Sequence, residues 1–145
     1  MPTTPINVYS VQKLEPLFDP DTARQRAAGI APSLTIARGT LLGEITASPG
    51  VYSPYASTHT DGTQVPKLIC AYDITTDASS NVTLSATAGQ TGAFAPGDAG
   101  KTVPAYVCGT FRTTDLTGLD ATAVTALGAR FEQGSLSAGG IVRIP

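Results

Sequence analysis

The sequence predicts a mainly β domain of the α+β class, with one or two short helices around one hydrophobic core. Two patterns support this class: short apolar runs separated by glycine and proline, and one segment whose apolar residues have helical spacing. The length of 145 residues fits one core of ordinary size. We therefore expect a single β-rich domain over residues 33–145, preceded over residues 1–32 by an extended N-terminal arm with a short helix.

Composition narrows the classes of partner. Asp, Glu, Lys and Arg make up only 14% of the chain, against about 25% in ordinary soluble domains, so a surface rich in Thr, Ser, Ala and Gly is expected to pack against other protein. The net charge of -2 provides no basic field for nucleic acid. No apolar run approaches the roughly 20 residues that span a bilayer. We expect no nucleic-acid or membrane partner, and synthesis in the cytoplasm.

The N-terminal arm has the pattern of an extended strand. Apolar and polar residues alternate from Thr4 to Val11, and Ile6, Val8 and Val11 are the candidates for one apolar face of an extended strand. Such a strand can add to the sheet of another chain. Two alternatives stay open, a terminal strand of the domain's own sheet and a frayed tail.

A short helix is expected behind this strand. Asp19 can cap it and Pro20 can occupy its first turn, with the helix running from Asp21 to Ala28 and ending at Gly29. The segment has almost no apolar stripe, so burial would not anchor it.

The body of the domain is expected to hold several short strands. Val65 to Ile74 is the longest apolar run, and its near-continuous character predicts a central strand covered on both faces. Leu34 to Ile36 and Thr40 to Ile45, joined through a glycine, predict a hairpin. Further strands are expected over Val82–Leu84, Val103–Cys108 and Ile141–Ile144.

The clearest helix lies near the C-terminal end. Asp120 is expected to cap a helix over Ala121 to Gln133, and Gly134 to end it. Its apolar stripe would pack on the sheet and consists of Val124, Leu127 and Phe131.

Residues that could carry catalysis are few. His59 is the single histidine, and its Thr, Asp and Gly neighbours indicate an exposed turn, so a site built on several histidines is excluded. Cys70 and Cys108 lie in apolar runs, which predicts two buried, reduced thiols; if their strands are neighbours, a disulfide is geometrically feasible.

Two carboxylate pairs have the spacing that acid–base catalysis would need. These pairs are Asp73 with Asp77 and Asp115 with Asp120, but the residues between them indicate turn and cap chemistry. We therefore expect that the protein is not an enzyme and that it binds no cofactor and no metal.

The order of several motifs resembles the head decoration protein family of tailed phages, the phage lambda protein D group. The most specific stretch is Gly109-Thr110-Phe111-Arg112, which follows an apolar strand. The other motifs, in chain order, are Thr40-Leu41-Leu42-Gly43, the central strand ending in Tyr72-Asp73, the helix with Val124 and Leu127, and the strand Ile141-Val142-Arg143-Ile144. The resemblance covers residues 33–145, and the chain departs from the lambda protein in its longer N-terminal region and in an insertion over Ser85 to Lys101.

The resemblance implies a fold and a function. It implies a small β-barrel or β-tulip-like domain, which binds as a homotrimer at three-fold sites of the expanded head and stabilises the capsid against internal DNA pressure. The N-terminal arm would add a strand to the major capsid protein. By similarity, the capsid-binding residues would be Ile6, Val8, Tyr9 and Val11. The protein would be made in the host cytoplasm and reside on the outer surface of the virion.

Two other classes are consistent with a Thr- and Gly-rich β composition. One is a phage tail, baseplate or virion-displayed β module that binds host surface glycans; the absence of Trp and the aromatic content of 6% disfavour it. The other is a small enzyme, which lacks a convergent cluster of polar residues in the sequence.

Overall fold

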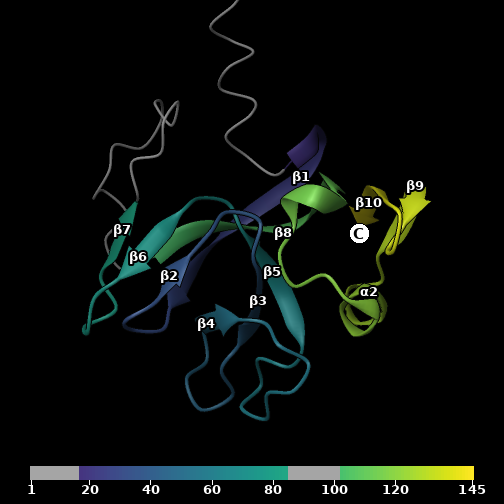
Figure 1. Ribbon diagram of the computed structural model, residues 1–145. Coiled ribbons are helices and arrows are strands. Elements are labelled where there is room, and N and C mark those ends of the chain that lie inside the picture. Colours follow the sequence, from purple (N-terminus) through teal and green to yellow (C-terminus); the bar gives the residue numbers. More distant parts are fainter. Residues whose placement is uncertain (1–16, 85–101) are drawn as a thin grey trace, which may run out of the picture.

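The computed structural model describes residues 17–84 and 102–145. The structure is mainly β, with 51% of residues in strands, and the described part holds a single α-helix (Figure 1). The predicted strand from Thr4 to Val11 and the insertion from Ser85 to Lys101 lie outside the described residues. The mainly β fold class predicted from the sequence is confirmed.

The strands form a seven-stranded and a three-stranded sheet. In chain order the elements are β1 (Leu17–Ile30), β2 (Thr35–Ile36), β3 (Leu41–Glu44), β4 (Val51–Pro54), β5 (Pro66–Cys70), β6 (Ile74–Thr76), β7 (Val82–Leu84), β8 (Thr102–Arg112), the 3-10 turn η2 (Thr113–Asp115), α2 (Ala121–Leu127), β9 (Arg130–Ser135) and β10 (Gly139–Ile144).

Five strands close into a small barrel. They are hydrogen-bonded in the order β1-β4-β3-β5-β8, and the pairing of β1 with β8 closes the ring. β1 runs parallel to β4 and antiparallel to β8. The second half of β8 also pairs with β10, and β10 pairs in turn with β9. Strands β2, β6 and β7 form the separate sheet on the opposite side of the barrel (Figure 1).

Alternation along the strands divides the buried side chains into two clusters. Leu42 and Leu68 belong to the first cluster, to which all five barrel strands and the three-stranded sheet contribute. Leu41 and Ile69, their neighbours in sequence, belong to the second cluster, which includes Ala123 of α2 and residues of β10. The barrel wall is therefore covered on both faces, as the continuous apolar run in this region predicted.

The predicted helix from Asp21 to Ala28 is wrong, because this segment is part of strand β1. Its backbone pairs with β8, with Ala28 opposite Val103 and Gly29 opposite Thr102. A helix without an apolar stripe gains little from packing, whereas this strand buries Ala28 and satisfies backbone hydrogen bonds on β8. Residues 17–30 of the predicted arm thus belong to the barrel.

The predicted C-terminal helix is correct at its start and wrong at its end. Asp120 caps it as expected, but the helix stops at Gly128, whose φ of 62° is left-handed. The Gly128 N–H bonds back to carbonyl oxygens of the last turn, a common helix ending. Phe131 therefore reaches the second cluster from β9 rather than from the helix, and Ala123 is the buried helix residue.

Two further strand predictions are corrected. Leu34–Ile36 and Thr40–Ile45 do not form a hairpin, since β2 pairs with β6, and β3 with β4 and β5. The run from Val65 to Ile74 divides into β5 and β6, which lie in different sheets. The strands predicted at Val82–Leu84, Val103–Cys108 and Ile141–Ile144 are confirmed as β7, β8 and β10.

Candidate functional site

The predicted capsid-binding residues lie outside the described part of the chain. These residues are Ile6, Val8, Tyr9 and Val11. What the structure does describe is the point where the chain enters the barrel, with Leu17 opposite Phe111 and Asp19 opposite Thr110. On its other side, the same part of β8 pairs with β10, with Val142 opposite Phe111. The end of β8 therefore pairs with the first residues of β1 on one side and with the C-terminal strand β10 on the other.

This part of β8 is tightly packed. Phe111 is 0% exposed, and its ring meets that of Tyr106 edge to face at a centroid distance of 5.6 Å. Gly109 and Thr110 are also buried. Gly109 to Arg112, expected as the exit of a strand, is instead the paired end of an eleven-residue strand. The first residues of β1 thus pair with a closely packed part of the core.

A pocket of about 400 Å³ opens between the β3–β4 turn and the segment that enters β5. We call it the Glu44–Lys67 pocket. It combines aliphatic and polar lining residues, which are Glu44, Ile45, Thr46, Pro49, Gly62, Gln64, Val65 and Lys67.

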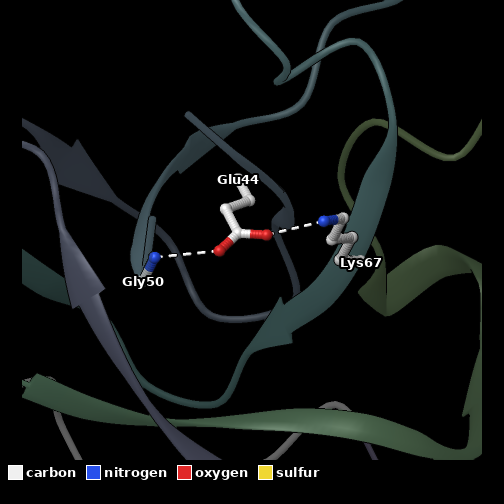
Figure 2. A network of polar contacts seen from close by, with 3 residues as sticks. All are labelled: Glu44, Gly50 and Lys67. Atoms are coloured by element: carbon white, nitrogen blue, oxygen red, sulfur yellow. Dashed lines mark hydrogen bonds and ion pairs between the residues drawn. The ribbon is translucent and has the colours of Figure 1, made fainter. Parts of the chain in front are cut away.

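An ion pair lies in the wall of this pocket (Figure 2). Oε2 of Glu44 accepts a hydrogen bond of 2.6 Å from Nζ of Lys67, and Oε1 accepts one of 2.8 Å from the Gly50 N–H. The hydrogen bond from Lys67, followed by that from Gly50, lowers the pKa of Glu44, and the same ion pair raises the pKa of Lys67. The Glu44 carboxylate therefore joins the β3–β4 turn to β5.

Sequence reasoning did not find this ion pair. Its members are 23 residues apart and have opposite charges, which many other pairs in the chain also have. They meet because β3 and β5 are neighbours in the barrel, and the hairpin predicted for β3 hid that neighbourhood. The ion pair could have been predicted only from the order of the strands in the sheet.

The loop around His59 forms a small network of its own. The Thr63 hydroxyl donates a hydrogen bond of 2.5 Å to Oδ1 of Asp61, so Nδ1 of His59, 2.7 Å from the same hydroxyl, is the donor in their contact. Hydrogen bonds from the hydroxyl and the backbone N–H of Thr63 lower the pKa of Asp61. His59 is exposed, as predicted, whereas Thr63 is 0% exposed. The Thr63 hydroxyl stabilises the loop and is not open to a substrate.

The first predicted carboxylate pair serves the backbone. Oδ1 of Asp73 accepts a hydrogen bond from the Arg38 N–H at 2.8 Å. Asp77 accepts hydrogen bonds from the N–H groups of Ser79 and Asn81 in the turn between β6 and β7. These contacts match the turn chemistry expected from the sequence.

In the second pair, Asp120 serves the backbone in the same way. Oδ1 of Asp120 accepts a hydrogen bond of 2.7 Å from the Ala123 N–H at the start of α2 and one of 2.9 Å from the Tyr55 hydroxyl. Asp115 ends the 3-10 turn η2. The predicted cap at Asp120 is confirmed.

Both cysteines are free thiols and buried, as predicted. Burial raises the pKa of Cys70 to about 11, and its Sγ donates to the carbonyl oxygen of Tyr72. Cys108 lies opposite Arg24 in the β1–β8 pairing, and a hydrogen bond between the two side chains raises the pKa of Arg24. Protonated Cys70 is a poor nucleophile at neutral pH.

Two further features concern residues 17–84 and 102–145. No three His, Cys, Asp or Glu residues of these ranges lie together as a metal site would require. No helix in the same ranges is long and apolar enough to cross a membrane. Among known proteins, no family model, curated protein or solved structure matches the chain.

Proposed function

We propose that the chain is a capsid decoration protein of a tailed phage. In this proposal it binds as a homotrimer at three-fold sites of the expanded head and stabilises the capsid against internal DNA pressure. Residues 1–16 would add a strand to the major capsid protein, with Ile6, Val8, Tyr9 and Val11 in contact with it. The observation that carries the proposal is the way in which β1 anchors the arm in the closed barrel.

The anchor suits a clamp that must resist tension. β1 pairs with β8 at Leu17 and Asp19 and, after a shift in register, again from Arg24 to Gly29. A pull on residues 1–16 would act on β1, whose paired stretch from Gln25 to Gly29 is held to β8 by consecutive antiparallel partners. The ring closure leaves β1 with a second neighbour, since β4 pairs with it at Gly29 and Ile30. An arm attached here transmits force to the whole barrel.

The arm itself has the pattern that strand addition needs. Backbone hydrogen bonds would give affinity, and the apolar side chains of Ile6, Val8 and Val11 would fill pockets on the partner. One short strand binds weakly. Three arms on one trimer share a single attachment, so the second and third contacts form at a raised effective concentration.

The low charge of the chain favours extensive protein contact. Only 14% of its residues carry a formal charge, and charged groups are depleted in the core of protein interfaces because burying them costs free energy. A trimer on a capsid lattice places much of the surface of each subunit against protein. Few charges have to be paired or desolvated when such contacts form.

The proposal is tested by mixing the purified chain with expanded empty heads of its source phage. We expect the chain to sediment with the heads, cryo-EM density to appear at the three-fold sites, and the decorated heads to withstand higher temperature than bare ones. Absence of the chain from the sedimented heads would contradict the proposal. Density only at a tail or baseplate would favour the alternative assignment as a tail module.

A further inference from the structure

We propose that the open edge of β1, residues 24–27, is a docking site for an extended acidic segment of a partner protein. The segment would add to the barrel as a further antiparallel strand, with acidic side chains beside Arg24 and Arg26. The site is distinct from residues 1–16, and the inference does not depend on the capsid assignment.

The backbone of β1 has a strand on only one side along residues 24–27. β8 pairs with all four residues. β4, the second neighbour of β1, pairs with it only at Gly29 and Ile30. The chain that enters β4 comes from β3, which lies on the far side of β4. No described strand therefore covers the other side of residues 24–27.

Alternation along β1 shows which backbone groups face the open side. The Gly29 N–H bonds to the carbonyl oxygen of Gly50, on the β4 side. Because the backbone groups of a paired strand point to alternate sides, the N–H and C=O of Gln25 and Ala27 point to that side too. Pro104 lies opposite Ala27 and fits this pattern, since it has no N–H to give. Gln25 and Ala27 are both exposed, so these groups are available to a partner strand.

Two cations border these backbone groups. Arg24 and Arg26 are exposed, and neither makes an ion pair with another described residue. The acidic residues earlier in the strand, Asp19 and Asp21, precede the regular stretch of pairing with β8. Residues 24–27 thus carry two positive charges and no negative one.

These charges decide which strand fits. In an added strand, the residue opposite Arg26 lies close to it on the same face, so an opposite charge there stabilises the pair and a like charge destabilises it. Two copies of the open edge match poorly. Antiparallel pairing centred on Arg26 places that residue opposite itself, and pairing centred on Gln25 places Arg24 opposite Arg26. A segment with alternating carboxylates gains both ion pairs, and antiparallel addition is favoured because it is the more stable arrangement per residue.

The test uses the folded chain labelled for NMR and a set of matched peptides. The probe is acetyl-Thr-Val-Glu-Val-Glu-Thr-amide, whose Glu residues would lie opposite Arg26 and Arg24 and whose Val residues would lie opposite Ala27 and Gln25. We expect the probe to shift the amide signals of Gln25 and Ala27 with a Kd on the order of 1 mM. A peptide with Gln in place of both Glu residues should bind about tenfold more weakly, because each exposed ion pair contributes about threefold.

Methylation of the peptide backbone tests strand addition directly. In the antiparallel register, the N–H groups of the two Val residues point to β1 and those of the two Glu residues point to solvent. A methyl group on the nitrogen of the second Val should therefore abolish the shifts. The matched control, a methyl group on the nitrogen of the second Glu, should preserve them.

Substitution of one arginine tests the charge. Arg26→Gln should weaken binding of the acidic probe about threefold and leave binding of the Gln peptide unchanged. Arg130→Gln removes an exposed cation of β9 and should change neither.

Several outcomes would overturn the proposal. They are equal binding of the acidic and Gln peptides, retained shifts after methylation of the Val nitrogen, shifts confined to other strands, and no shift at all. Two further results would assign the edge to another occupant and overturn it as well. Sodium glutamate that reproduced the shifts would make the edge a site for small anions, and concentration-dependent shifts at Gln25 and Ala27 in the chain alone would make it a contact between two copies. The peptide comparisons on the unmodified chain remain decisive even if a variant fails to fold.

Discussion

The hydroxyl of Tyr55 donates a hydrogen bond of 2.9 Å to Oδ1 of Asp120, across 65 residues of sequence. The same oxygen accepts the Ala123 N–H that opens α2. Burial, followed by the hydrogen bond to Asp120, raises the pKa of Tyr55. One carboxylate thus fixes the start of the helix to the chain that follows β4, and this contact holds α2 over the second cluster.

Tyr55→Phe removes this hydrogen bond and keeps the ring. We expect the free energy of unfolding to fall by about 2 kcal/mol, because hydrogen bonds to charged groups contribute more than neutral ones. Guanidinium unfolding measures the change. Tyr52→Phe is the control, since Tyr52 is buried too and the described residues provide no hydrogen bond to its hydroxyl. An equal loss in both variants would show that the contact with Asp120 adds nothing.

Gly39 and Gly50 form a matched pair for testing the close packing of the η2 segment. Their φ angles are 83° and 84°, so alanine is strained at both, at a cost of about 1–2 kcal/mol. A Cβ on Gly50 meets nothing within 4 Å, whereas one on Gly39 would overlap the carbonyl oxygen of Asp115. We expect Gly39→Ala to cost more than about 4 kcal/mol and Gly50→Ala only the strain. Similar midpoints of thermal unfolding would contradict the packing described here.

The Glu44–Lys67 ion pair makes stability depend on acid pH. The pKa of Glu44 is lowered in the folded state from its usual 4.5. A lowered carboxylate pKa stabilises the fold above the pKa of the unfolded chain, and this stabilisation disappears as pH falls through the folded pKa. We expect the unmodified chain to be more stable than Glu44→Gln at pH 7, with the difference vanishing well below pH 4.5. A difference that stays constant with pH would rule out the ion pair as its source.

The Cys70 thiol should be inert in the folded protein. Its burial raises its pKa to about 11, so almost no thiolate is present at neutral pH. We expect its alkylation at pH 7.5 to proceed only at the rate of unfolding and to become fast in denaturant. Mass spectrometry of the alkylated peptides gives the rate for each cysteine. Rapid labelling of Cys70 at a protein concentration and pH where the chain is folded would contradict its described burial.

The strands with strong apolar patterns were predictable, and the elements whose identity depends on long-range pairing were not. β7, β8 and β10 follow from local alternation or apolar runs. The segment Asp21–Ala28 has capping residues typical of a helix, yet its partner β8 lies about 80 residues away in sequence, and that pairing overrides local propensity. The early end of α2 had a local signal, the glycine at position 128, which the helical spacing of Phe131 from Leu127 obscured.

The candidate sites show the same division. The capping role of Asp120 and the turn role of Asp77 follow from local sequence and are confirmed. The Glu44–Lys67 pocket was not predicted, because it depends on which strands are neighbours in the closed barrel. Ring closure is a property of the whole fold, and no single motif in the chain encodes it.

We propose that residues 1–16 attach the protein to the capsid and that the barrel from Leu17 onward presents them. Deleting residues 1–32 would be a poor test, because it removes β1 and opens the barrel. Deleting residues 1–16 keeps every described strand. The decisive measurement is sedimentation of this truncated chain with expanded heads, after its unfolding curve has been shown to match that of the full chain. We expect a folded protein that no longer sediments with heads, and a truncated chain that still binds them would contradict the proposed role of residues 1–16.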